Sequence, residues 1–251
     1  KPGYDELTRR HGPARAFGIL REGQNSLAWV ADFVAAEKID CDFRIAGRFH
    51  AAHNPAQYEA LAERLRTQPK GLEAEAHLVP RAEQRRELGT DAYFGGAVYV
   101  QHAAVDPGRF HRGMLERALA AGARVVPHCP AFAIRRDGTG FLIDTARGTI
   151  AARNVVVATN GYTSRLTPWL RRRVIPIGSY IIATEPLARD VMDRLMPANR
   201  IVSDTRKVVY YYRASPTSRP VTGSTPSQCA ALIPPSDPFG ELKVGLMRSG
   251  W

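Results

Sequence analysis

Three consecutive tyrosines and an arginine form the densest group of chemically useful side chains in this chain of 251 residues. Tyr210, Tyr211 and Tyr212 are followed directly by Arg213. A tyrosine joins a large apolar ring to a hydroxyl group, and a guanidinium can hold a carboxylate through two parallel hydrogen bonds. These residues could line a cleft that binds a carboxylate. Simple packing of the rings and a structural salt bridge of the arginine are the alternatives.

The tyrosines lie in a segment that we expect to be a strand, residues 208–212. Successive side chains of a strand point to opposite faces, so Tyr210 and Tyr212 share one face and Tyr211 lies on the other. An earlier stretch, residues 174–184, is rich in β-branched residues and also favours strand structure. The candidates for a binding cleft are therefore Tyr180, Tyr210, Tyr212 and Arg213.

Other residue spacings that resemble metal, dinucleotide or catalytic sites lack the further residues that such sites need. His50 and His53 could ligate a metal, but no Cys, Asp or Glu lies at a supporting distance, so we expect no metal site. Gly138-Thr139-Gly140 resembles the start of the dinucleotide fingerprint G-x-G-x-x-G, yet a strand-like run follows it in place of a helix. We expect a hairpin turn there. No Ser-His-Asp arrangement is convincing, and the catalytic residues stay unknown.

The segment from Asp106 to Thr163 has the clearest structural pattern. Asp106-Pro107 is typical of a helix start, and Gly122 of a left-handed helix cap. Strands are expected at residues 123–126, 132–134, 141–145, 149–151 and 154–158. The first and last are apolar runs without alternation, as in parallel strands buried on both faces, and the others form a β-meander. The pattern predicts part of a doubly wound, Rossmann-like α/β domain.

The same segment resembles the FAD-dependent oxidoreductases of the D-amino-acid oxidase type. The resemblance is carried by the strings VDPGRF (105–110), AGARV (121–125), PAFAI (130–134) and TIAARNVVVATNGY (149–162). Two later strings, PIGSYIIATEPL (176–187) and DTRKVVYYYR (204–213), are similar to the subgroup around gamma-glutamylputrescine oxidase. The resemblance covers roughly residues 1–220 and fails from about Thr222 onward.

The resemblance implies an FAD site in the doubly wound domain. It places Ala131 where the family's meander approaches the adenine, and it places a run of small and polar residues at the strand end that faces FAD. That run is Ala158, Thr159, Asn160 and Gly161. Cofactors bind at the carboxyl ends of strands in such sheets, which makes small residues there sensible. A buried strand that ends in a glycine turn is the purely structural alternative.

The resemblance also implies a reaction. The enzyme would oxidise the C–N bond of an amine or amino acid to an imine, with a gamma-glutamylputrescine-like compound as the favoured substrate. Oxygen would be the electron acceptor, or a carrier if the protein is a dehydrogenase. A non-catalytic basic module or an inactive fragment is the rival reading. In the family the G-x-G-x-x-G unit lies upstream of everything seen here, so we expect an internal fragment that is inactive and cannot hold FAD by itself.

The fold class that we predict is α/β with an α+β second domain, in which an antiparallel sheet binds the substrate. We expect helical and strand segments that link to the substrate domain, the second half of the FAD-binding domain, the substrate-domain sheet, and a divergent, loop-rich tail. Their ranges are 1–100, 101–163, 164–221 and 222–251. The paired glycines Gly95-Gly96 indicate a bulge or a close backbone approach, which the resemblance would place near the flavin.

Composition narrows the partners of the protein. The net charge of +11 is dispersed, and no aromatic residues interleave with the one basic run, Arg171 to Arg173, so we expect no nucleic-acid partner. Three widely spaced cysteines favour a reducing, cytoplasmic setting. No apolar run approaches the length of a membrane span.

Overall fold

The structure is a computed structural model that describes residues 3–175, 180–184, 186–214, 220–224 and 244–247. The chain divides into two compact units. The first combines Lys1–Arg117 with Ser179–Trp251, and the second is Ala118–Gly178. Residues 1–100 and 179–221 lie in the first unit, because strands from both ranges belong to the same sheet. The four expected domain ranges stay a prediction.

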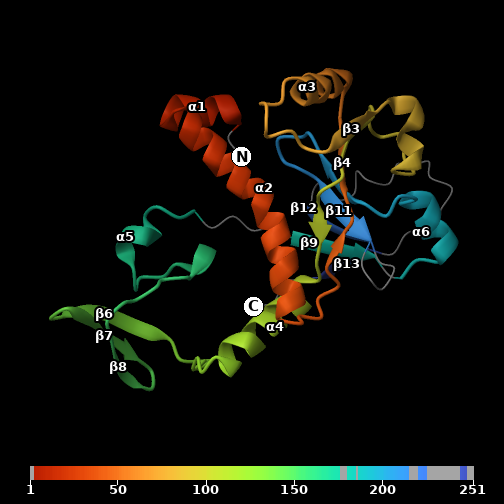
Figure 1. Ribbon diagram of the computed structural model, residues 1–251. Helices are drawn as coiled ribbons and strands as arrows, with labels where there is room; N and C mark the ends of the chain where they lie inside the picture. The colour runs from red at the N-terminus through yellow and green to blue at the C-terminus, as the bar shows by residue number, and fades with distance from the viewer. Residues whose placement is uncertain (1–2, 176–179, 185, 215–219, 225–243, 248–251) are drawn as a thin grey trace. The chain divides into compact units, whose positions relative to one another are not determined.

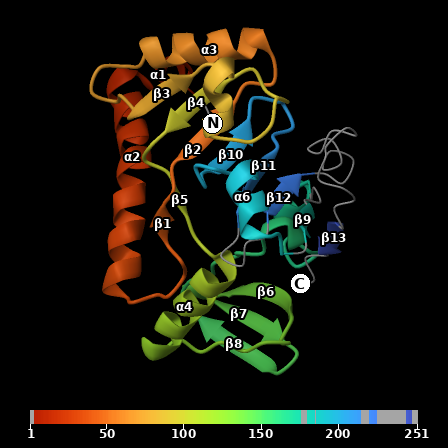
Figure 2. The ribbon, with the colours of Figure 1, turned by 90° about the vertical axis from the view of Figure 1, so that its right-hand side faces the viewer.

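The described residues form both helices and strands (Figures 1 and 2). The helices are α1 (Tyr4–His11), α2 (Pro13–Ala36), α3 (Pro55–Arg66), α4 (Pro107–Ala120), α5 (Pro168–Arg171) and α6 (Arg189–Leu195), with the 3-10 turns η1 (Arg81–Arg86) and η2 (Asn160–Tyr162). The strands are β1 (Arg44–Ile45), β2 (Arg48–Ala51), β3 (Ala76–Val79), β4 (Gly96–Tyr99), β5 (Ala103–Ala104), β6 (Ala131–Asp137), β7 (Gly140–Thr145), β8 (Gly148–Ala152), β9 (Tyr180–Thr184), β10 (Ile201–Asp204), β11 (Tyr211–Ala214), β12 (Pro220–Ser224) and β13 (Val244–Met247).

The first unit is built on an eight-stranded sheet of the described strands, in the order β13-β9-β12-β11-β10-β2-β4-β3. All neighbours are antiparallel except β10 and β2, which run parallel. The parallel pair joins the N-terminal and C-terminal parts of the chain. In Figure 1, α2 lies on one side of this sheet and α6 on the other.

One face of the sheet carries the main hydrophobic core. Phe49 of β2, Val98 of β4 and Val202 of β10 are at most 1% exposed, and Met192 and Met196 from the α6 region pack against them. Because successive strand residues face opposite sides, the neighbours of these core residues must point away from α6. The second face of the sheet therefore remains for other contacts.

Local signals set the helix starts as the sequence predicts. The Asn54 side chain caps α3 by accepting a hydrogen bond from the Gln57 backbone N–H at 2.9 Å. Asp106 caps α4 in the same way, with its Oδ1 accepting from the Arg109 N–H at 2.9 Å. Each cap is followed by a proline, whose missing N–H costs nothing at the first helical position. Gly122 after α4 has φ of 87°, as expected for a left-handed cap.

The paired glycines allow close backbone approach inside the sheet. A Cβ on Gly95 would lie 2.5 Å from the Val79 carbonyl oxygen, and a Cβ on Gly96 would lie 2.5 Å from that of His50. Both distances are shorter than any real contact of a Cβ atom. The glycines thus let β3 and β2 pair closely around β4, which is a structural reason for their presence.

The second unit contains the β-meander that the turn residues predict. Strands β6, β7 and β8 pair antiparallel in sequence order, and Gly138 and Gly148 at the two turns have positive φ. Ile134, Ile143 and Ile150 lie side by side across the three strands. No described residue from Ala118 to Ile175 is fully buried.

The two parallel strands expected on either side of the meander are not formed. Residues 124–126 and 154–158 have no regular secondary structure, and Val156 is 88% exposed. A parallel strand inside a sheet needs hydrogen-bond partners on both sides. None of the described strands pairs with either segment, so their apolar composition alone does not make them strands.

Part of the tail expected to be loop-rich is regular. Residues 222–224 end β12, and β13 pairs with β9 in register Leu246↔Ile182. The strand β13 forms because the distant strand β9 supplies its hydrogen-bond partners, and the local sequence gives no sign of this pairing. Residues 225–243 and 248–251 lie outside the described residues.

Candidate functional site

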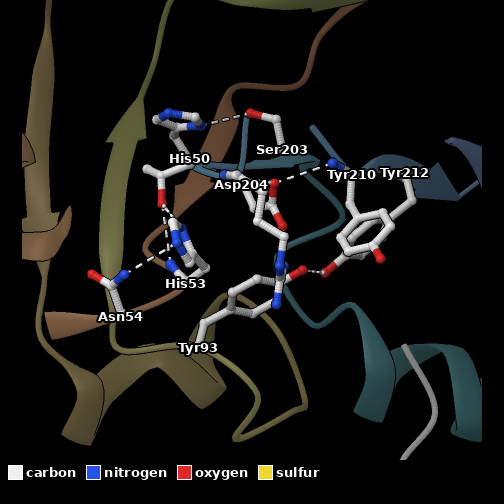
Figure 3. A network of polar contacts seen from close by, with 10 residues as sticks. His50, His53, Asn54, Tyr93, Ser203, Asp204, Tyr210 and Tyr212 are labelled. Atoms are coloured by element: carbon white, nitrogen blue, oxygen red, sulfur yellow. Dashed lines mark hydrogen bonds and ion pairs between the residues drawn. The ribbon is translucent and has the colours of Figure 1, made fainter. Parts of the chain in front are cut away.

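A row of polar side chains crosses the face of the large sheet that is opposite the main core. His50 of β2, Ser203 of β10 and Tyr211 of β11 are cross-strand partners in direct register. Each alternates with a core residue on its own strand, so the three side chains share the second face. The His50 Nδ1 and Ser203 Oγ atoms are 2.9 Å apart and hydrogen bonded (Figure 3).

His50 is held in its neutral form. Burial lowers its pKa from the ordinary 6.5 to about 4, and the nearby positive charges of Arg48 and Arg64 act in the same direction. Desolvation and like charges both disfavour the imidazolium ion. Near neutral pH, the ring can therefore accept or donate a hydrogen bond at Nε2 without carrying charge.

Two arginines on this second face have unsatisfied nitrogen atoms. Arg213 on β11 donates a hydrogen bond from Nη2 to the Val105 carbonyl at 2.7 Å, but its buried Nη1 has no partner among the described residues. In the same part of the chain, the buried Nε of Arg48 on β2 also has no partner, and the Arg48 guanidinium lies 5.0 Å from the ring centroid of Tyr99. A buried N–H without an acceptor is costly, so such atoms suggest an acceptor supplied by a ligand.

The opposite, core-facing side holds a network around Asp204, which is fully buried. Its Oδ1 accepts hydrogen bonds from the backbone N–H groups of Arg206 and Tyr210, at 3.2 and 3.1 Å. Its Oδ2 forms an ion pair with the Arg206 guanidinium. The carboxylate thereby closes the β10–β11 hairpin. Figure 3 shows Asp204 between β10 and the tyrosine side chains.

Two buried phenols complete this network. The Tyr212 hydroxyl donates to the Tyr93 hydroxyl at 3.5 Å (Figure 3). The Arg206 guanidinium lies over the rings of Tyr93 and Tyr210, at 5.7 and 4.9 Å from their centroids. Burial raises the pKa of Tyr93 and raises that of Tyr212 well above its ordinary value. Both phenols therefore stay protonated at neutral pH.

The structure separates the cleft candidates. Tyr210 is 7% exposed, and Tyr212 packs against the main core, so both belong to the core-facing network. Arg213 points to the second face together with Tyr211, which is 48% exposed. The backbone of Tyr180 lies in β9, and its side chain is outside the described residues. A role for Tyr210 or Tyr212 in the substrate cleft stays a prediction. Because both side chains pack in the core-facing network, they would act on the cleft through the residues around them.

The residues expected at the cofactor lie in the second unit. Ala158, Thr159 and Asn160 are exposed, and Gly161 is half-buried. Asn160 and Gly161 begin the turn η2, and the Thr163 Oγ1 donates to the Asn160 carbonyl at 2.7 Å. Ala131 begins β6 at a register irregularity. Residues 158–161 do not follow a regular strand, and their contact with FAD stays a prediction.

The sequence interpretation missed several members of these sites. Tyr93, Arg206 and Ser203 gain their roles only when distant strands meet, since Tyr93 and Tyr212 are 119 positions apart. Asp204 could have been found, because an aspartate before a turn often bonds the backbone N–H two residues later. His50 and His53 each bond a hydroxyl group, of Ser203 and of Thr205 respectively. No group of His, Cys, Asp and Glu in the described residues could hold a metal ion.

The chain belongs to a family of flavoenzymes. Residues 2–243 match the family described as DAO, FAD dependent oxidoreductase. Among curated proteins, gamma-glutamylputrescine oxidoreductase of Escherichia coli is 29% identical over 187 residues, which are 74% of this chain and 43% of that protein. The probable oxidoreductase OrdL of Haemophilus influenzae is 24% identical over 230 residues, which are 90% of this chain and 53% of that protein. The chain thus spans about half the length of these relatives.

Solved structures show the same fold. The glycine oxidase of Geobacillus kaustophilus matches with a TM-score of 0.64 and 18% identity, over 82% of this chain and 55% of that chain. The glycine oxidase of Bacillus cereus matches with a TM-score of 0.66 and 16% identity, over 82% of this chain and 56% of that chain. The mixed α/β fold class with a meander is thereby confirmed as that of the family. None of the described helices is long and apolar enough to cross a membrane.

The family is FAD-dependent, but the described residues do not fit the cofactor's pyrophosphate. A pyrophosphate site needs free N–H donors at a helix N-terminus after a glycine-rich turn. No helix in the described residues follows a turn of the form G-x-G-x-x-G, since α1 and α2 each follow a single glycine, Gly3 and Gly12. The N-terminus of α4 is capped by the carboxylate of Asp106, which would repel an anion, and that of α3 is capped by Asn54. These helix N-termini therefore do not form the binding site of the FAD pyrophosphate.

Proposed function

We propose that this chain supplies the substrate-binding sheet of an FAD-dependent oxidoreductase that oxidises the C–N bond of an amine or amino acid to an imine. The membership in the family and the glycine oxidase fold support the reaction class. Within this proposal the eight-stranded sheet is the substrate domain, and the unit Ala118–Gly178 belongs to the cofactor domain, including Ala131 and Ala158 to Gly161.

The observation that carries the proposal is the buried Nη1 of Arg213, for which the described residues supply no hydrogen-bond partner. The Nη2 bond to Val105 fixes the guanidinium, and the second nitrogen is left to bond an external oxygen. A substrate carboxylate is the acceptor that best matches a guanidinium in charge and geometry. Arg213 would thus bind and orient the substrate, while Tyr210 and Tyr212 would act only through the β10–β11 hairpin.

The proposed substrate class includes gamma-glutamyl amines, because a relative named gamma-glutamylputrescine oxidoreductase is 29% identical. The electron acceptor is oxygen in our proposal, and an electron carrier would make the enzyme a dehydrogenase. We place the enzyme in the cytoplasm, where the free thiols of Cys41 and Cys129 would stay reduced.

Flavin reduction tests the function. The FAD-loaded, full-length protein should lose its oxidised flavin absorbance when mixed without oxygen with gamma-glutamylputrescine or with simple amino acids. Readmitting oxygen should regenerate the spectrum and release peroxide in equal amount. Slow reoxidation by oxygen with fast reoxidation by a quinone would favour the dehydrogenase. Absence of flavin reduction across amines and amino acids would reject both.

A further inference from the structure

A small pocket lies between α3 and the carboxyl ends of β2 and β10. Its volume is about 190 Å³. Helix α3 contributes one wall, and the other walls come from β2 and from the start of the β10–β11 hairpin. It is lined by His50, Gln57, Ala60, Leu61, Arg64, Asp204, Thr205, Arg206 and Val209. Ligand pockets usually have volumes of about 300–1,000 Å³, so this pocket would hold one end of a ligand and not a whole ligand.

Three of the lining side chains have polar atoms to offer. No described residue forms a hydrogen bond with the side-chain amide of Gln57 or with the guanidinium of Arg64. His50 uses Nδ1 to bond Ser203, which leaves its Nε2 available. The other polar lining groups are already engaged, because Thr205 bonds His53 and Asp204 bonds Arg206. The free groups therefore comprise an amide, a guanidinium and an imidazole.

The charge in the pocket is positive. Arg64 has no carboxylate partner among the described residues, whereas Arg66, two positions later, is paired with Glu63. Asp204 is neutralised by Arg206 and by two backbone N–H groups. Arg64 and His50 line the same pocket, and the positive charge of Arg64 is one of the causes that lower the pKa of His50. A cation that lacks its counter-charge beside neutral hydrogen-bonding groups favours an anionic occupant.

We propose that this pocket binds a carboxylate group of a small organic ligand, with Arg64 as the charged partner and Gln57 and His50 as hydrogen-bonding partners. Resting on the proposed function, the ligand is a substrate with a second carboxylate besides the one that Arg213 holds. The apolar walls of Leu61, Ala60 and Val209 would cover the methylene groups next to that carboxylate. The substrate class is then an amine or amino acid of acidic, glutamate-like chemistry.

The experiment measures binding without any flavin. The chain is labelled with ¹⁵N at histidine, and the His50 signals are assigned with the variant His50→Asn. Glutarate is the probe, because it carries carboxylates on a short aliphatic chain. We expect saturable shifts of the His50 Nε2 signal with glutarate and none with glutaramide, its uncharged diamide. Arg64→Gln should raise the Kd for glutarate at least tenfold, while Arg66→Gln should keep it within twofold.

Several results would overturn the proposal. They are an unmoved His50 signal at saturating glutarate, an equal response to glutaramide, unchanged binding in Arg64→Gln, or tighter binding of inorganic phosphate than of glutarate. The Trp and Tyr signals of each variant report that the chain is folded. The proposed function is tested separately by flavin reduction. If no substrate reduces the flavin, the proposed function is wrong, and the result of the glutarate titration is unaffected.

Discussion

The eight-stranded sheet and the three-stranded meander differ in how they are covered. The eight-stranded sheet packs Phe49, Val98 and Val202 against the α6 side and keeps arginines and His50 for the other face. The three-stranded meander has no fully buried residue among those described, and Phe132 on β6 is 65% exposed. The meander is held by backbone hydrogen bonds and by partly exposed side-chain contacts such as the Arg135–Asp144 ion pair, whereas the large sheet also has a buried face. Only a sheet with a packed face can hold polar groups of its other face in fixed positions.

The largest expected effect comes from removing the core of the large sheet. Phe49→Ala should lower the free energy of unfolding by about 3–5 kcal/mol, because Phe49 is 0% exposed and its loss leaves a cavity. The matched change Phe132→Ala on the meander should stay within about 0.5 kcal/mol. Urea unfolding followed by tryptophan fluorescence measures both. Equal costs would show that the two sheets are not packed differently.

The second effect tests the close approach at the glycine pair. Gly96→Ala should cost about 1–3 kcal/mol, since the new methyl group would meet the His50 carbonyl and the backbone has little room to move. Gly18→Ala is the control, because nothing lies within 4 Å of a Cβ there and α2 is helical. The control should stabilise the protein by roughly 0.5–1 kcal/mol. A neutral Gly96→Ala would contradict the packing of β2 against β4.

A third effect depends on pH and on burial of His50. Its pKa is about 4 in the folded chain and near 6.5 when unfolded, so protons bind the unfolded state first as the pH falls. Stability should therefore drop between pH 6.5 and 4 and level off below, by on the order of 1–2 kcal/mol for a half-buried group. Thermal melts of wild type and His50→Gln measure it. A variant with the same pH slope as wild type would argue against a neutral, buried His50.

The smallest effect concerns the buried phenols. Tyr212→Phe removes only a long hydrogen bond to Tyr93, so we expect a loss of about 1 kcal/mol or less in unfolding free energy. Flavin content and turnover of the FAD-loaded protein should stay near wild type if Tyr212 acts only through packing. A large fall in turnover at unchanged stability would show that Tyr212 contributes directly to the substrate cleft.

Local signals explain which parts of the fold could be predicted. The cap at Asp106 and the turn glycines of the meander act within a few residues, and the sequence identifies them. The strand expected at residues 154–158 is not formed. Apolar composition alone does not show whether a neighbouring strand is present to supply hydrogen-bond partners. The pairing of β2 with β10 joins segments about 150 positions apart and leaves no local pattern. For the same reason Arg213 could be named as a candidate, but its orientation and that of Tyr212 could not.

Arg213 lies on the polar face of the large sheet. The central prediction is that it binds the carboxylate of the substrate. The most direct test compares the KM for an amino acid with that for the amine that lacks its carboxylate, in the FAD-loaded, full-length protein as wild type, as Arg213→Gln and as the meander control Arg136→Gln. We predict that Arg213→Gln raises the KM for the amino acid at least tenfold, leaves that for the amine nearly unchanged, and retains its flavin. Equal KM values in Arg213→Gln and wild type for the amino acid would contradict the account.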